Sequence, residues 1–96
     1  MKPSLVLAMH REVIRRVVAA HHASNPRVFG SVVHGDDHDG SDLDILIEPT
    51  SETTLFDIGA IRHELIQLLN VPVDVLTPRA LPEKFRATVL AEAVPV

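Results

Sequence analysis

The sequence predicts an α+β fold with its elements in the order α-β-β-α-β-α. Two observations support this prediction. Apolar residues recur at spacings of three and four in residues 6–20 and 55–68, as on one side of a helix, whereas short stretches such as DLDILIE alternate in character, as in a strand. A length of 96 residues is that of one domain, so we expect residues 1–96 to form a single domain.

The composition favours a folded globular protein. Hydrophobic residues make up 46% of the chain and the formal net charge is −4, which is not typical of a disordered chain. The chain has no cysteine, which excludes disulfides, thiolate nucleophiles and Cys-based zinc sites within it. No apolar run approaches the ~18 residues of a membrane span, and the first residues do not resemble a signal peptide. We therefore expect a soluble, cytoplasmic protein without a membrane partner.

Charge is unevenly distributed along the chain. No Lys or Arg lies between Arg27 and Arg62, and the acidic residues of this interval are Asp36, Asp37, Asp39, Asp42, Asp44, Glu48, Glu52 and Asp57. Such a block repels a nucleic-acid backbone and attracts divalent cations. Trp and Tyr are absent, so a surface for stacking bases is missing as well. Direct binding of nucleic acid is therefore not expected.

The first element is predicted to be a helix. The apolar positions on its buried side are Val6, Met9, Val13, Val17 and Ala20. Glu12 and Arg16 have the i,i+4 spacing of an exposed ion pair. The helix should end near HHASNP, because the residue before a proline is disfavoured in helical conformation.

Two strands are predicted next, separated by a loop. RVFGS forms a short strand that stops at Gly30, residues 31–41 form the loop, and DLDILIE forms a strand that Pro49 closes. The loop residues Asp36, Asp37 and Asp39 are interpreted as solvent-exposed.

The second half of the chain is predicted to contain a helix, a strand and a final helix. The helix within TSETTLFDIGAIRHELIQLLN would be capped by Ser51 or Thr53 and would end at Asn70. Its predicted buried residues are Leu55, Ile58, Ile61, Leu65 and Leu68. VPVDVLT is the third strand, and Pro82 suits the first turn of a last helix within LPEKFRATVLAEAV.

Three carboxylates are predicted to share one face of the sheet. Side chains alternate along a strand, so Asp42 and Asp44 point away from the core that receives Leu43 and Ile45. Asp74 takes the same face if its strand is a neighbour. A lone Asp-x-Asp is more often a solvated strand edge, but three carboxylates together form the ligand set for one or two Mg²⁺ ions in phosphoryl transfer.

A glycine turn precedes these carboxylates. Gly30 lets the backbone approach a ligand closely, and the Ser31 hydroxyl with nearby N–H groups can hold phosphate oxygens. Gly35 would turn the loop so that Ser41 returns beside the turn. Gly30, Ser31, Gly35 and Ser41 are therefore the predicted nucleotide-binding residues, facing a site for a nucleoside triphosphate with Mg²⁺.

A calcium-binding loop is the competing interpretation of DDHDGSDLD. If Gly40 takes the glycine position of that loop, the first and twelfth positions fall on Gly35 and Leu46. Both end ligands are then missing, which excludes a calcium loop.

The motif FGSVVHG, the following SDLDILIE and the later VDVLTP resemble the minimal nucleotidyltransferase family of the DNA polymerase β superfamily. The resemblance covers nearly the whole chain. It implies a small mixed sheet with helices packed on one face. It also implies that Gly30 and Ser31 bind triphosphate, that Asp42 and Asp44 hold Mg²⁺, and that Asp74 completes the site and helps to activate the acceptor hydroxyl.

Such proteins are similar to antitoxins whose partner is an all-helical HEPN ribonuclease toxin. The resemblance implies transfer of AMP from ATP to a tyrosine of that toxin. This chain has no tyrosine, so a tyrosine acceptor must belong to a partner. His34 departs from the family, since many relatives have Arg there, and triphosphate binding would then depend on metal and backbone donors.

Three functional hypotheses remain open at this point. The first is a Mg²⁺-dependent protein adenylyltransferase that neutralises a HEPN toxin. The second is a non-catalytic antitoxin that inhibits its toxin by binding, for which His34 is the supporting feature. The third is the catalytic half of an enzyme that modifies a small molecule such as an antibiotic.

Overall fold

The structure is a computed structural model that describes all 96 residues. Its elements follow one another as α1 (Pro3–Ala20), β1 (Ala23–Phe29), α2 (Ser31–His34), β2 (Leu43–Pro49), α3 (Leu55–Leu69), β3 (Val73–Leu76), the 3₁₀ turn η1 (Pro78–Ala80), α4 (Glu83–Glu92) and β4 (Val94–Pro95). No helix of the fold combines the length and the apolar character that crossing a membrane would require.

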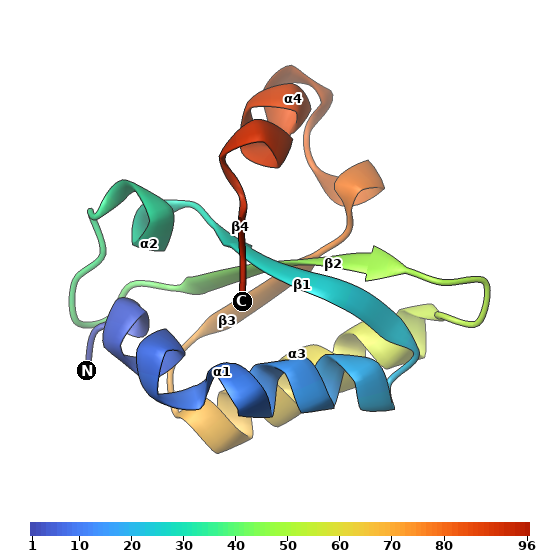
Figure 1. Ribbon diagram of the computed structural model, residues 1–96, viewed down its shortest axis with the longest axis horizontal. Helices are drawn as coiled ribbons and strands as arrows, with labels where there is room; N and C mark the ends of the chain where they lie inside the picture. Colours follow the sequence, from blue (N-terminus) through green and yellow to red (C-terminus); the bar gives the residue numbers. More distant parts are fainter.

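The strands form one mixed sheet in the order β3-β2-β1-β4 (Figure 1). β2 pairs with β1 in antiparallel fashion and with β3 in parallel fashion, while the short β4 extends the sheet beside β1. Parallel neighbours need a long crossover between them, and α3 provides it. This arrangement confirms the small mixed sheet implied by the sequence.

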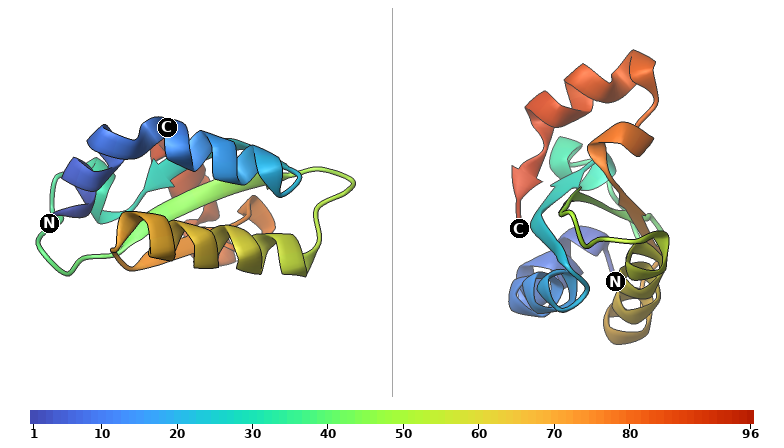
Figure 2. Two further views of the ribbon diagram at one scale, coloured as in Figure 1. Left: turned by 90° about the horizontal axis from the view of Figure 1, so that it is seen from below. Right: turned by 90° about the vertical axis from the view of Figure 1, so that its right-hand side faces the viewer.

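The two long helices pack against one face of the sheet, where the core lies (Figure 2). Leu43, Ile45 and Ile47 of β2 are fully buried there, with Ile14 of α1 and Leu65 of α3. α4 stands apart on the other side and has no buried residue. The sheet face opposite α1 and α3 therefore lacks a covering layer of long helices.

The loop predicted after the first strand contains a short helix. Gly30 precedes α2 with φ 74°, and Gly35 ends it in left-handed conformation with φ 73°. Val32 and Val33, which were assigned to the loop, are partly buried against the core. Burial of these two valines, at positions where a loop would expose them, explains why this stretch folds as a helical turn.

β1 is longer than predicted and begins at Ala23. α1 ends at Ala20, directly before HHASNP, as predicted, while Asn25 and Pro26 lie within β1 and form an irregularity in the pairing with β2, between Ser24 and Arg27. Asn25 has φ 48°, and proline, which has no N–H to donate to the ladder, is tolerated at such a bulge because the bulged residues are not paired there.

The predicted buried sides of both long helices are partly wrong. In α1 Met9 is 64% exposed and Ala20 is exposed as well, because the buried side of the helix is centred on Leu7, Ile14 and Val18 and these two residues lie at its edge. In α3 Leu55 and Leu68 are exposed, and Leu69 is buried instead. The residues that do fill the core from these helices are Val6, Leu7, Ile14, Val17, Val18, Ile61, Leu65 and Leu69.

The structure also differs in detail from the predicted helix cap and from the predicted ion pair on the helix surface. Glu12 pairs with Arg15 at 2.9 Å rather than with Arg16. Asn70 ends α3 as predicted, with φ 56° and its N–H bonded to the Ile66 carbonyl. The cap of α3 is Thr54, not Ser51 or Thr53, and its side chain accepts a hydrogen bond from the Asp57 N–H.

Thr54 and Asp57 form a reciprocal capping box. The Asp57 carboxylate accepts the Thr54 N–H at 2.8 Å, while the Thr54 hydroxyl accepts the Asp57 N–H at 3.2 Å. Both donors would otherwise lack an acceptor within the helix.

Replacing Thr54→Ala is expected to lower the free energy of unfolding by about 1 kcal/mol, since the cap is lost. Ser51→Ala, a matched change at an exposed position, should leave stability within about 0.5 kcal/mol. Urea unfolding followed by circular dichroism measures both. Equal losses in the two variants would show that Thr54 is not the residue that caps α3.

Candidate metal and nucleotide site

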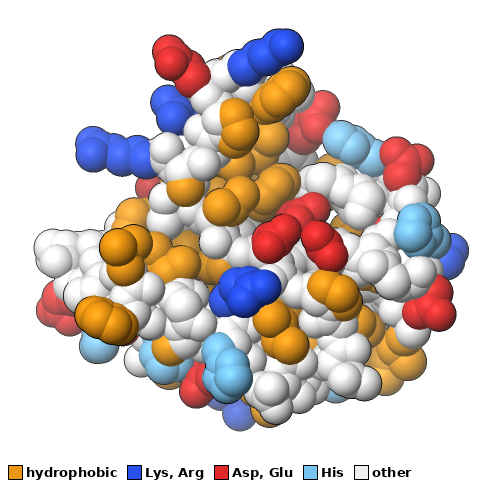
Figure 3. Space-filling view, turned by 180° about the vertical axis from the view of Figure 1, so that it is seen from behind, with side chains coloured by type: hydrophobic (Ala, Val, Ile, Leu, Met, Phe, Trp, Pro, Cys, Tyr) orange, Lys and Arg blue, Asp and Glu red, His pale blue; other side chains and the backbone are white.

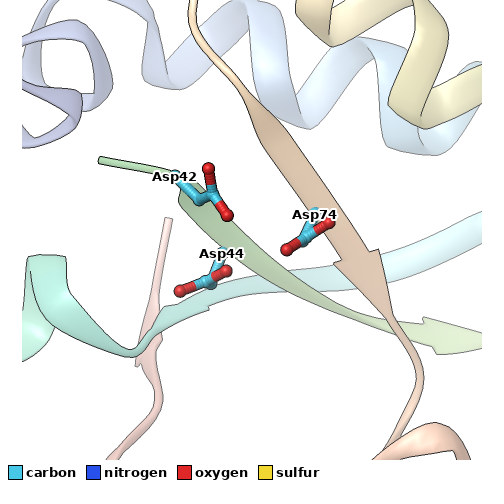
Figure 4. Close-up of side chains that lie close together, drawn as sticks. All are labelled: Asp42, Asp44 and Asp74. Atoms are coloured by element: carbon cyan, nitrogen blue, oxygen red, sulfur yellow. The ribbon is translucent and has the colours of Figure 1, made fainter. Parts of the chain in front are cut away.

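Asp42, Asp44 and Asp74 converge on the sheet face opposite the long helices. The parallel register places Asp44 directly beside Asp74, and Asp42 immediately precedes β2. One carboxylate oxygen from each lies within 4.8 Å of the others, and the three side chains point toward one another (Figure 4). The structure thus brings together the three carboxylates that strand alternation placed on one face.

This acidic group lacks an internal counter-charge. None of the three carboxylates takes part in a salt bridge, and the cation on the adjacent strand, Arg27, pairs with Glu48 at 2.8 Å instead. Burial, together with repulsion from Asp74 and Asp42, raises the pKa of Asp44 to about 6. Carboxylates in this situation are stabilised by a cation, and oxygen ligands are those that hard divalent cations prefer.

The glycine turn lies directly against the carboxylates. Gly30 follows β1, in which Phe29 pairs with Asp44 across the ladder. A Cβ atom at Gly30 would overlap Oδ2 of Asp44, and the backbone has φ 74° and ψ −144°, which side-chain-bearing residues rarely adopt. Glycine is therefore required here for two reasons, and its backbone borders the carboxylate oxygen Oδ2 of Asp44.

Ser31 and Gly35 delimit α2 beside this turn. Ser31 is the first residue of α2, where backbone N–H groups have no acceptor within the helix. The Ser31 carbonyl accepts the Asp36 N–H at 2.9 Å, which brings the chain back after Gly35. The places of Gly30, Ser31 and Gly35 agree with the predicted turn, and their contact with a nucleotide stays a prediction.

Ser41 has a structural contact in the loop before β2. Its Oγ accepts the His38 N–H at 2.9 Å, and its own N–H donates to the His38 carbonyl at 3.0 Å. Ser41 thus closes a turn next to Asp42. Its role in binding a nucleotide also remains a prediction.

Two contacts near the site were not predicted from the sequence. The Nε2 atom of His34 lies 2.6 Å from Oε2 of Glu92, which ties the end of α2 to the end of α4. Asp37, interpreted as a solvated loop residue, is only 9% exposed, and its carboxylate accepts a hydrogen bond from the Ser4 N–H at 2.8 Å. Both contacts join residues at least 33 positions apart, so local sequence carries no signal for them. Asp36 and Asp39 are exposed, as expected.

Acidic side chains gather near the middle of one face of the molecule, bordered by hydrophobic side chains (Figure 3). Asp42 and Asp74 are exposed and Asp44 is half-buried, so the carboxylates are accessible to a ligand in solution. A mixed sheet with helices on one face, a glycine turn and three carboxylates on the other defines the polymerase β-like nucleotidyltransferase fold.

Comparisons with known proteins agree with this class. The family model described as nucleotidyltransferase domain matches residues 11–96. A proposed protein adenylyltransferase of Methanocaldococcus jannaschii is 31% identical over 88 residues, which cover 88% of this chain and 95% of that protein. The chain therefore belongs to the nucleotidyltransferase family, and within it to the minimal nucleotidyltransferases.

Solved structures show the same fold. A structure described as a proposed minimal nucleotidyltransferase has a TM-score of 0.85 and 38% identity, over 97% of this chain and 95% of that one. A toxin–antitoxin crystal structure with AMP-PNP has a TM-score of 0.73 and 18% identity, over 90% of this chain and 70% of that one. The second likeness shows the fold alone.

Gly30→Ala is expected to destabilise the protein by about 1–3 kcal/mol, because alanine strains the backbone at this φ and its Cβ displaces Asp44. The matched control is Gly59→Ala within α3, where a Cβ meets open space, and it should raise stability by about 0.5–1 kcal/mol. Denaturant unfolding of both variants tests the contrast. A Gly30→Ala protein as stable as the wild type would contradict the close approach of Asp44.

The raised pKa of Asp44 predicts a dependence of stability on pH in metal-free protein. Between pH 4 and 6 the folded state holds a proton that the unfolded state has released, so the contribution of Asp44 to stability falls as pH rises through about 6. Asp44→Asn should then be more stable than wild type at pH 7.5, by on the order of 1 kcal/mol after allowance for solvent screening.

Urea unfolding in EDTA at pH 4 and pH 7.5 measures this difference, which should vanish at the lower pH. The exposed Asp36→Asn removes one charge as a control and should show no comparable gain. A gain of equal size at both pH values would rule out titration of Asp44 as its cause.

Proposed function

We propose that the chain transfers AMP from ATP to a tyrosine hydroxyl of a partner HEPN toxin, in a Mg²⁺-dependent reaction that neutralises the toxin. The observation that carries this proposal is the convergence of three carboxylates beside the Gly30 turn, on a sheet face without a covering helical layer. Residues 1–96 would act as one nucleotidyltransferase domain, and ATP as donor suits a cytoplasmic location.

The carboxylate group fits a divalent metal site. Asp42, Asp44 and Asp74 offer oxygen ligands within 4.8 Å of one another and carry no competing ion pair. Bound Mg²⁺ would neutralise charge on the triphosphate and on the departing pyrophosphate. The raised pKa of Asp44 is what unneutralised carboxylates at this spacing should show.

The chain's own groups would position the nucleotide. The backbone at Gly30, which has no Cβ, leaves room for a phosphate close to Asp44, and the first turn of α2 offers the Ser31 N–H and hydroxyl. Gly35 ends that turn, and Ser41 holds the loop that leads to Asp42. The acceptor oxygen would attack the α-phosphorus in line as the bond to pyrophosphate breaks.

Asp74 would receive the acceptor. It lies on β3, the edge strand of the sheet, and its side chain is exposed. An acceptor hydroxyl approaching from outside would meet Asp74, whose carboxylate could accept the proton that the hydroxyl loses.

The acceptor would come from a partner protein. The chain contains no tyrosine, so it cannot modify a tyrosine of its own. The relative from Methanocaldococcus jannaschii is named as a proposed protein adenylyltransferase, and structures of similar fold are toxin–antitoxin complexes, one of them with AMP-PNP. These names support a toxin acceptor and ATP as the donor.

Asp42→Asn is expected to reduce AMP transfer at least 100-fold, because one of three ligand carboxylates is lost, while the fold persists because like-charge repulsion is relieved. Asp36→Asn, which removes a charge from the exposed loop, should retain near wild-type activity. Circular dichroism checks the fold of both. Normal labelling by Asp42→Asn would exclude the metal-site assignment.

Intact-mass spectrometry of the partner provides the readout. A HEPN-type toxin, sought first in the gene next to the one for this chain, is incubated with the chain, ATP and Mg²⁺, and its mass is then measured. A mass increase of one or more AMP units on a tyrosine supports the proposal. Inhibition of the toxin without a change in mass would instead support an antitoxin that acts by binding, and AMP found only on a small molecule would support an antibiotic-type transferase.

A further inference from the structure

We propose that Asp37 is a positioning residue for the metal site, which acts by fixing the loop that carries Asp42 to the first turn of α1. This inference rests on the proposed metal-dependent function. It concerns a residue that the sequence alone places among solvated loop aspartates, next to Asp36.

Among the charged residues of the chain, Asp37 is the one that is buried, with 9% of its surface exposed. Its Oδ2 atom accepts a hydrogen bond from the Ser4 N–H at 2.8 Å, across 33 residues of sequence. Ser4 lies in the first turn of α1, and Lys2 at the N-cap position provides no side-chain cap. Asp37 therefore supplies from a distant loop the acceptor that a helix start requires.

The rest of the loop is bonded locally, to α2 and, through the exposed Asp39, to the N-terminal ammonium of Met1 at 2.7 Å. The Asp36 N–H donates to the Ser31 carbonyl at 2.9 Å, and His38 and Ser41 close a turn with each other. Asp37 connects this bonded loop to α1 through a buried side chain. Its hydrogen bond with Ser4 also lowers the pKa of Asp37, so the acceptor stays ionised.

Asp42 depends on this connection more than the other two carboxylates do. Asp44 and Asp74 lie within the ladder and face each other in register. The ladder begins one residue after Asp42, at Leu43, so the strand pairing does not hold Asp42 directly. The loop before it therefore decides where its carboxylate sits, and outer partners of metal ligands typically affect metal affinity by 10–100-fold, as an order of magnitude.

A purely structural cap would behave differently. Loss of a cap lowers the stability of α1 but leaves the affinity of the folded protein for metal unchanged. A positioning role changes metal affinity in protein that is fully folded. Metal affinity, measured apart from catalysis, is therefore the readout that separates the two roles.

The test is a titration of full-length protein with Mn²⁺, in which electron paramagnetic resonance reports the free ion. Asp37→Ala should weaken binding about 10-fold. Asp37→Asn should stay within about twofold of wild type, because the amide oxygen can accept the same bond from Ser4. Asp36→Ala and Asp36→Asn are the matched controls and should also stay within about twofold, since Asp36 is exposed.

Two results would overturn the proposal. One is wild-type affinity in folded Asp37→Ala, and the other is an equal loss in Asp37→Ala and Asp36→Ala, which would indicate a general effect of charge. If wild-type protein binds no Mn²⁺, the metal site itself is wrong and the proposed function fails as well. If wild type and Asp37→Ala bind Mn²⁺ with the same affinity, only the positioning role of Asp37 is refuted, and the proposed function is not.

Hydrogen exchange in wild-type protein decides the matter if Asp37→Ala does not fold. Coupling between two sites is reciprocal, so saturating Mg²⁺ should slow exchange of the Ser4 amide several-fold. The Asp57 amide, which occupies the matching first turn of α3 and bonds to Thr54, is the control and should not change. Exchange at Ser4 that does not respond to Mg²⁺ would refute the connection.

Discussion

The parallel pairing of β2 with β3 is the constraint on which the site depends. Its register sets Asp44 beside Asp74, and a slip of one residue would turn every side chain of β2 to the opposite face. Leu43 and Ile45, both fully buried, oppose such a slip because their burial in the core would be lost. The hydrophobic core thus holds two like charges next to each other.

Core packing therefore offsets the electrostatic cost of holding these carboxylates close together. This cost appears in the raised pKa of Asp44, and a second, steric constraint appears at Gly30, whose backbone conformation only glycine adopts readily. Both features lie at the end of the β1–β2 ladder, where Phe29 and Asp44 pair. The carboxylates that would bind a metal ion therefore lower the stability of the metal-free fold, and we expect a bound cation to remove this repulsion.

The segment between the two strands is held by contacts from three directions. His34 joins α2 to Glu92 of α4, Ser31 receives the chain returning from Gly35, and Asp37 reaches α1. Such anchoring suits the proposed role of this loop in presenting Asp42 to a metal ion, because a loosely held ligand binds metal weakly. The connections also couple both ends of the chain to the site.

The sequence by itself determined the strand faces, the shared side of Asp42 and Asp44, and the end of α3 at Asn70, whereas the pairing of β2 with β3 that brings Asp74 beside them came from the tertiary structure. The first three follow from alternation and from turn chemistry, which are local properties of a chain. Only the tertiary structure decided the burial of Asp37, the helical turn at Val32 and Val33, and the exposure of Met9 and Leu68. Each of these depends on what packs against the residue from a distant segment, and no local pattern in the sequence encodes that neighbour.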